Sequence, residues 1–203
     1  RPFLSPESSN NMTEACPGGQ AFRMSMGCDT ESGVDDEGAD LGILLAVVCD
    51  GMGGANGGYY ASSTTVGIFS NGLDMSFDNL KPKQIENLLV EAVRTANEAV
   101  YKTSCEQSDL SGMGTTLVSA LVLGDTAYVV HVGDSRAYHV NGKKISRITT
   151  DHSVVQQLVE LGQITEEEAR VHPEKNMITR AVGVKGSVEP DVTSVKLSKN
   201  SAI

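Results

Sequence analysis

Residues 41–63 read LGILLAVVCDGMGGANGGYYASS, an apolar run that ends at an acidic residue and continues into glycines. The run from Ile43 to Cys49 is almost continuously apolar, which predicts a strand buried on both faces or nearly so. Asp50 follows it, and the glycines after Asp50 let the chain turn sharply and bring main-chain carbonyls close to a bound ion. The segment therefore favours a hard-cation site. The alternative is a strand-to-helix turn in which Asp50 only caps the next helix.

The composition excludes several classes of partner. The chain has 203 residues, a net charge of −10 and a pI of about 4.8, which argues against nucleic acid or an anionic membrane as the main partner. Its four cysteines lack C-x-x-C spacing, and no signal peptide or long apolar run is evident. These features favour a soluble, cytoplasmic protein. Because the chain begins with Arg1, we expect a processed or incomplete chain; its oligomeric state is not predicted.

The whole chain divides into a tail and a domain. Residues 1–20 are rich in Pro, Ser and Asn and predict a disordered tail or linker, while residues 21–203 predict one domain. A strand is expected at 21–28. The acidic loop that follows it can supply oxygen ligands beside Asp50, although most acidic loops are only solvated.

The rest of the pattern predicts an α+β layered domain. Helices are expected at 59–71, 82–100, 154–161 and 165–170, the third capped by Asp151 or a neighbour and the fourth opened by a capping box at Thr165. Strands are expected at 117–123, 127–132, 135–140 and 144–148 as an antiparallel meander, and again at 177–182 and 188–197.

Five short motifs occur in order along the chain. They are DGMGG at 50–54, GMGTT at 112–116, VGDSR at 132–136, TDHS at 150–153, and HP at 172–173 followed by ITRAVG at 178–183. Together they resemble the motif set of the metal-dependent type 2C (PPM) Ser/Thr protein phosphatases, especially the bacterial branch. The resemblance covers roughly residues 24–197. It implies a central antiparallel β-sandwich flanked by helices, in agreement with the elements predicted from the pattern.

The resemblance also implies a chemistry. In this family two Mn²⁺ or Mg²⁺ ions hold a water that attacks phosphoserine or phosphothreonine in a protein substrate, and a third ion is possible. By resemblance Asp50 is the bridging, catalytic carboxylate, the Gly51 carbonyl is a further metal ligand, and Asp134 belongs to the third metal. The alternative for Asp134 is a carboxylate that fixes a hairpin turn.

The chain departs from the family pattern ahead of Asp50. The family's phosphate-clamping Arg and its Asn-Glu-Asp group are not visible there, so no phosphate-binding residue is assigned. Among the nearby acids Asp35, Asp36 and Glu37, we prefer Glu37 as a metal ligand. Met52 stands where eukaryotic members place a His, so a water would have to donate the proton. No chemical role is assigned to the histidines at 131, 139, 152 and 172.

The family's C-terminal Ser-Asp-Gly and Asp-Asn motifs are absent before Ile203. We therefore expect a domain truncated at its C-terminal end, with an incomplete sandwich. The leading prediction is a metal-dependent protein Ser/Thr phosphatase. The alternatives are a weak or inactive phosphatase-like domain that binds a phosphoprotein or another partner, and a small-molecule or Ca²⁺-binding module.

Overall fold

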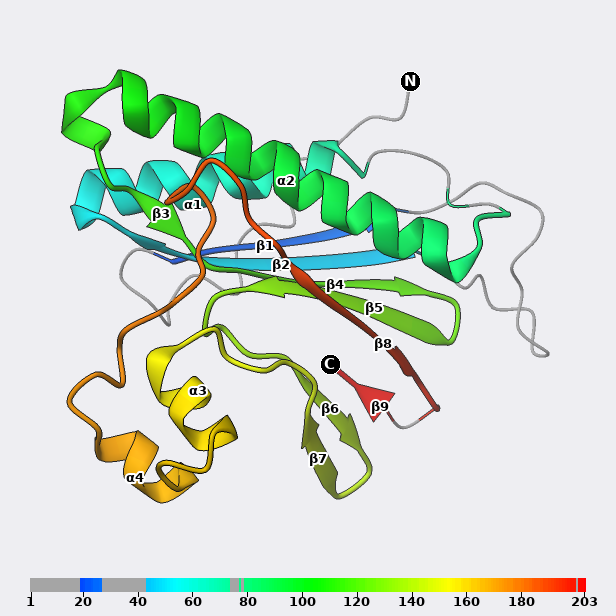
Figure 1. The fold of residues 1–203 in the computed structure, drawn as a ribbon. Helices are drawn as coiled ribbons and strands as arrows, with labels where there is room; N and C mark the ends of the chain where they lie inside the picture. The colour runs from blue at the N-terminus through cyan, green and yellow to red at the C-terminus, as the bar shows by residue number, and fades with distance from the viewer. Residues whose placement is uncertain (1–18, 27–42, 74–76, 78, 200) are drawn as a thin grey trace.

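The computed structural model describes residues 19–26, 43–73, 77, 79–199 and 201–203 (Figure 1). The predicted ligand Glu37, its neighbours Asp35 and Asp36, and residues 1–18 of the predicted tail lie outside these residues. The division into a tail and one domain therefore stays a prediction.

Two antiparallel sheets form the centre of the described chain. The larger has the strand order β1-β2-β4-β5-β8, with β3 paired to the end of β2, and the smaller has the order β7-β6-β9. The strands are β1 (Gly19–Met26), β2 (Ile43–Met52), β3 (Gly114–Thr115), β4 (Leu117–Leu123), β5 (Thr126–Val132), β6 (Tyr138–Asn141), β7 (Lys144–Arg147), β8 (Asp191–Lys196) and β9 (Ser201–Ala202).

The helices lie on both sides of the larger sheet. They are α1 (Gly54–Asn71), α2 (Pro82–Glu106), the short 3₁₀ helix η2 (Ser108–Leu110), α3 (Val154–Glu160) and α4 (Glu166–Val171). Figure 1 shows α1 and α2 over one face of the larger sheet, with the smaller sheet, α3 and α4 on the opposite side. This arrangement confirms the predicted α+β fold with antiparallel sheets flanked by helices.

The main core lies between the larger sheet and the two long helices. The apolar stripe of α2 contributes Ile85, Leu89 and Val93, which pack in one cluster with residues of β2, β4 and β5. Beneath these helices β2 buries Leu45, Val47 and Cys49, but Val48 is 44% exposed. The prediction that this strand is buried on both faces is therefore wrong. The long helices cover only one face of the sheet, so β2 alternates between covered and open positions.

The predicted meander is also wrong in one connection. β4 and β5 form the expected hairpin through Gly124 and Asp125, and β6 and β7 form a second hairpin. However, β5 pairs with β8 on its other side, and β6 belongs to the smaller sheet. The chain leaves the larger sheet at Gly133, whose φ is 107°, a conformation that glycine adopts without strain. This change of sheet depends on tertiary packing that strand patterning does not encode.

The segment predicted as a strand at 177–182 is not one. It makes only two isolated bridges, Ser153 with Ile178 and Thr115 with Val182, because its ends contact two different parts of the fold. The buried side chain of Asn97 in α2 holds the next residues, 183–185, in place. It donates to the Lys185 carbonyl at 3.0 Å and accepts from the Gly183 amide at 2.8 Å.

The helix starts show which capping predictions hold. α1 begins at Gly54, earlier than the expected residue 59, and its N-cap is Gly53 with no side-chain cap, so the alternative in which Asp50 caps this helix is wrong. For α3 a neighbour of Asp151 is the cap, because Ser153 accepts from the Gln156 amide. The predicted capping box of α4 is confirmed, with Thr165 and Glu168 bonded reciprocally.

Candidate metal centre

Asp50 lies near the end of β2, where the strand meets the first turn of α1. A Cβ added at Gly51 would lie 1.9 Å from the carbonyl oxygen of Gly58 in α1. Only glycine at position 51 allows this approach. The glycine-rich sequence thus brings the Asp50–Gly51 peptide directly against the start of the helix.

Thr116 fixes the main chain of Asp50. Its amide donates to the Asp50 carbonyl at 2.9 Å, and the Asp50 amide donates to Thr116 Oγ1 at 3.0 Å. Thr116 is buried and Asp50 is exposed, so the bonds are shielded from water on the Thr116 side. The backbone from which the Asp50 carboxylate projects is therefore held on both its donor and its acceptor side.

Asp134 directly follows the turn at which the chain leaves β5. Burial raises the pKa of its carboxyl group, and the negative charges of Asp151 and Asp50 raise it further. Within the described part of the chain, no hydrogen bond or ion pair from another side chain reaches the carboxylate of Asp50 or Asp134. Two neighbouring carboxylates that receive no hydrogen bond or ion pair from another side chain fit a divalent cation.

The donor set suits Mn²⁺ or Mg²⁺. These ions prefer carboxylate, carbonyl and water oxygens, and the described residues offer the two carboxylates and the Gly51 carbonyl. Octahedral coordination requires more oxygens than these. Water and acidic residues outside the described ranges, Glu37 among them, are the candidates for the remaining ligands.

Asp151 is excluded as a free ligand by its partners. Arg136 Nε lies 3.0 Å from both carboxylate oxygens, and Arg136 Nη2 lies 2.6 Å from Oδ2. Arg147 adds a longer ion pair at 3.5 Å. This bidentate pair satisfies the buried carboxylate and ties the turn after β5 to the start of the α3 segment.

A cavity of about 820 Å³ opens beside Asp134. Arg136, Arg147 and Asp151 line one part of it, and Arg170 and Lys175 line the part near α4. Both of these last two side chains are exposed, and no ion pair involving either is found among the described residues. The cavity therefore joins a candidate metal ligand to two cationic groups that are available to a ligand.

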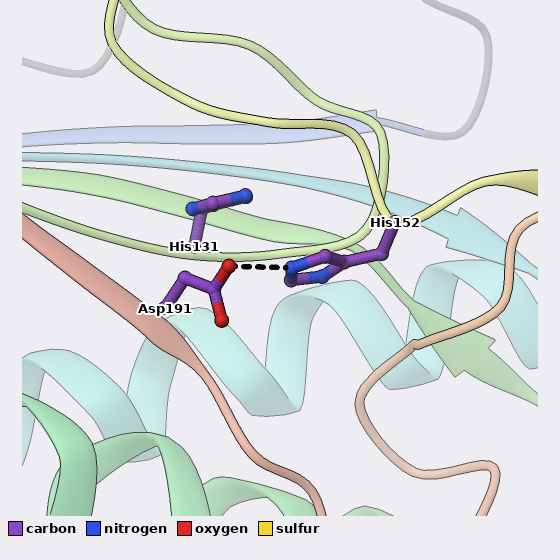
Figure 2. A group of neighbouring side chains, drawn as sticks. All are labelled: His131, His152 and Asp191. Atoms are coloured by element: carbon purple, nitrogen blue, oxygen red, sulfur yellow. Dashed lines mark hydrogen bonds and ion pairs between the residues drawn. The ribbon is translucent and has the colours of Figure 1, made fainter. Parts of the chain in front are cut away.

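His131, His152 and Asp191 form a second cluster of potential metal ligands (Figure 2). One potential ligand atom from each lies within 4.8 Å of the others. However, His152 Nδ1 accepts the Gly133 amide at 3.0 Å, so in the neutral ring the proton is on Nε2, which faces Asp191 Oδ2 at 3.2 Å. A metal on Nε2 would move that proton to Nδ1, against the Gly133 N–H.

The ring geometry also disfavours a metal at this second cluster. The two imidazoles stack with centroids 4.6 Å apart and planes at 18°, so their lone pairs lie in two nearly parallel planes and do not converge on one nearby ion. His131 Nε2 lies 2.8 Å from the Thr150 carbonyl, to which it donates. Burial lowers the pKa of His152, and the hydrogen bond to Asp191 opposes this only in part. The cluster is therefore a hydrogen-bonded support for the Gly133–Asp134 turn.

The comparisons with known proteins agree with this geometry. The family model described as protein phosphatase 2C matches residues 31–182. The chain belongs to the protein phosphatase 2C family.

Individual relatives of this phosphatase-family chain are bacterial. The serine/threonine phosphatase stp of Listeria monocytogenes is 35% identical over 159 residues, which are 78% of this chain and 63% of that protein. The chain thus spans slightly less than two thirds of that relative's length. The Streptococcus agalactiae serine/threonine phosphatase structure superposes with a TM-score of 0.74 at 31% identity, covering 90% of this chain and 76% of that one.

A third relative bears on the metal. The catalytic domain of the phosphatase PstP, solved in complex with two manganese ions, matches with a TM-score of 0.66 at 30% identity over 90% of this chain and 74% of that chain. Divalent metal ions therefore belong to the chemistry of this family.

Among the described residues of this chain, no helix is both long and apolar enough to cross a membrane.

Of the site residues predicted for this phosphatase-family chain, the structure brings Asp50, Gly51 and Asp134 to one end of the larger sheet and does not describe Glu37. The contribution of Thr116 was missed. Thr116 belongs to the GMGTT motif at 112–116, but that motif indicated only the family and not the contact of Thr116 with Asp50. Only the pairing of β2 with β3 and β4 shows that its hydroxyl faces Asp50.

Proposed function

We propose that this chain takes part in metal-assisted hydrolysis of phosphoserine and phosphothreonine in protein substrates. One observation carries the proposal. In a member of the protein phosphatase 2C family, the half-buried Asp134 carboxyl group lies close enough to Asp50 for the Asp50 charge to raise its pKa, and neither carboxylate receives a hydrogen bond or ion pair from another side chain among the described residues. Such a pair gains most from a divalent cation.

In this proposal the residues of the chain have distinct roles. Asp50, the Gly51 carbonyl and Asp134 hold Mn²⁺ or Mg²⁺, with Glu37 as a further candidate ligand, and the bound ions supply an activated water and offset phosphoryl charge. The cavity beside Asp134 receives the peptide around the phosphorylated residue. The Met52 side chain has no exchangeable proton, so water protonates the leaving seryl or threonyl oxygen. A cytoplasmic setting stays a prediction from the sequence.

The test is Mn²⁺-dependent phosphate release from a phosphothreonine peptide by this chain. Asp50→Asn keeps the side-chain shape and removes the negative charge, and we expect at least about a hundredfold loss of rate, as for the removal of a central electrostatic group. Asp109→Asn is the matched control, because Asp109 is exposed in η2, and it should keep the wild-type rate. A folded wild-type chain with no activity above background, or an Asp50→Asn variant as active as wild type, contradicts the proposal.

A second candidate function is phosphoprotein binding without turnover. It is favoured by the cavity, where Arg170 and Lys175 offer positive charge to a phosphate or an acidic side chain. Fluorescence anisotropy of the same peptide, labelled with a fluorophore, measures its binding to the chain. Binding that survives Asp50→Asn, is lost in an Arg170→Gln/Lys175→Gln variant and is accompanied by no phosphate release would assign this second function. Rapid turnover by the wild-type chain would reject it.

A further inference from the structure

The hydroxyl of Thr116 lies between the two candidate metal-ligating turns. Its Oγ1 accepts the Asp50 amide at 3.0 Å and lies 2.7 Å from Ser135 Oγ, to which it is hydrogen-bonded. Asp50 lies near the end of strand β2, and Ser135 directly follows Asp134. One oxygen atom therefore connects the main chain at the first carboxylate to the residue beside the second.

Packing reinforces this connection. Gly133, on the other side of Asp134, lies so close to Thr116 that an added Cβ would be 2.6 Å from Thr116 Cγ2 and 3.3 Å from its Cα. Thr116 is only 4% exposed, so its hydroxyl has no access to bulk water in place of these partners. Both neighbours of Asp134 in the sequence thus touch Thr116, as do both main-chain groups of Asp50.

Packing alone does not require a hydroxyl at this position. Valine has nearly the shape of threonine and would fill the same space, but it would leave the part-buried Asp50 amide without its acceptor and Ser135 without its partner. If Thr116→Val loses function and Thr116→Ser keeps it, the loss is therefore due to the missing hydroxyl and not to a change in side-chain volume.

We propose that Thr116 is a positioning residue that, through its hydroxyl, sets the separation of the Asp50 and Asp134 carboxylates for a divalent cation. The inference rests on the proposed metal centre. It predicts that the hydroxyl contributes to metal affinity even in the absence of any substrate, because the carboxylates are held at the correct spacing before the ion binds.

The test is calorimetric titration of the metal-free chain with Mn²⁺. Thr116→Val should weaken Mn²⁺ binding about tenfold, the equivalent of about 1.4 kcal/mol, while Thr116→Ser should stay within about twofold of wild type. Thr65→Val is the matched control. Thr65 is also fully buried, but its Oγ1 has no partner among the described residues, so this change should leave Mn²⁺ binding unaltered.

The outcomes separate this inference from the proposed function. Wild-type Mn²⁺ affinity in Thr116→Val, or equal weakening in Thr116→Ser, overturns the role of the hydroxyl. If Thr116→Val does not fold, Ser135→Ala replaces it, with an expected loss of about threefold, and unchanged binding in that variant overturns the inference. A wild-type chain that binds Mn²⁺ but releases no phosphate contradicts the function alone, and one that binds no Mn²⁺ contradicts both.

Discussion

At the residue scale, His152 shows how a buried polar group supports the candidate centre through the residue next to Asp134. Its main-chain amide donates to the Gly133 carbonyl at 2.9 Å, while its ring accepts the Gly133 amide and faces Asp191. Arg180 holds Asp191 from the other side at 2.9 Å. Since Gly133 precedes Asp134, His152 holds both main-chain groups of the residue next to a candidate ligand, the amide through its neutral imidazole and the carbonyl through its own main-chain amide.

This arrangement predicts a pH dependence of stability. The pKa of His152 is lower in the folded chain than its unfolded value of about 6.5. As the pH falls below that value, the unfolded chain therefore binds more protons than the folded chain, and the contribution of neutral His152 to stability declines. His152→Asn keeps an acceptor and removes the titration. We expect the difference in unfolding free energy between wild type and variant to shrink from about pH 7.5 to about pH 5.5.

Urea unfolding at several pH values measures this difference. Asp191 does not confuse the result, because its pKa is lowered by His152 and Arg180 despite the opposing effect of burial, so its contribution is lost only at a pH below about 4. A difference that stays constant across the range would show that His152 titrates alike in both states.

At the element scale, the contact of α1 with β2 determines where Asp50 lies. Gly58 and Gly51 touch through their backbones, so neither helix nor strand has side chains at the point of closest approach. The same helix contains Gly67, where an added Cβ would meet nothing within 4 Å. These two glycines of one helix therefore differ only in their surroundings.

Alanine substitutions should have opposite effects at these two sites. Gly58→Ala would place a Cβ 2.8 Å from backbone atoms of Gly51, and we expect it to lower the unfolding free energy by about 2–3 kcal/mol. Gly67→Ala should raise it by about 0.5–1 kcal/mol through helix propensity. Chemical denaturation of both variants measures this pair of effects. Stabilisation by Gly58→Ala would contradict the close contact.

At the scale of the whole molecule, the candidate centre lies where the two sheets separate. Asp50 belongs to the larger sheet, and Asp134 to the connection that leads from β5 to β6 in the smaller one. Burial and the negative charges of Asp151 and Asp50 disfavour the ionised form of Asp134 at this junction, and a bound cation would offset this. Metal binding should therefore stabilise the entire fold and not only the site.

Mn²⁺ should accordingly raise the Tm of the EDTA-treated chain in a concentration-dependent manner. A free concentration of about 100 times the Kd adds about 2.7 kcal/mol to the stability of a one-site protein. The increase should disappear in an Asp50→Asn/Asp134→Asn variant, as followed by scanning fluorimetry. An equal increase in that variant would place the ion elsewhere, with the cluster of His131, His152 and Asp191 as the first site to examine.

Much of the architecture was predictable because it depends on local signals. The stripe of α2, the capping box of α4 and the turns after β4 and α3 are each specified by residues a few positions apart, and each is confirmed. The strand predicted at 177–182 failed for the converse reason. Its apolar residues are used in single contacts with distant segments, which have no period along the chain.

The sequence by itself determined the family and the α+β class, and it predicted Asp50 and Asp134 as metal ligands, because motifs and periodicity are local properties of the chain. Only the tertiary structure decided that β6 leaves the larger sheet, that Arg136 neutralises Asp151, and that Thr116 connects the turns of Asp50 and Asp134. These last features join residues that lie far apart in sequence. They depend on strand register and on the close approach allowed by glycines, and both are fixed only when the sheets and helices pack together.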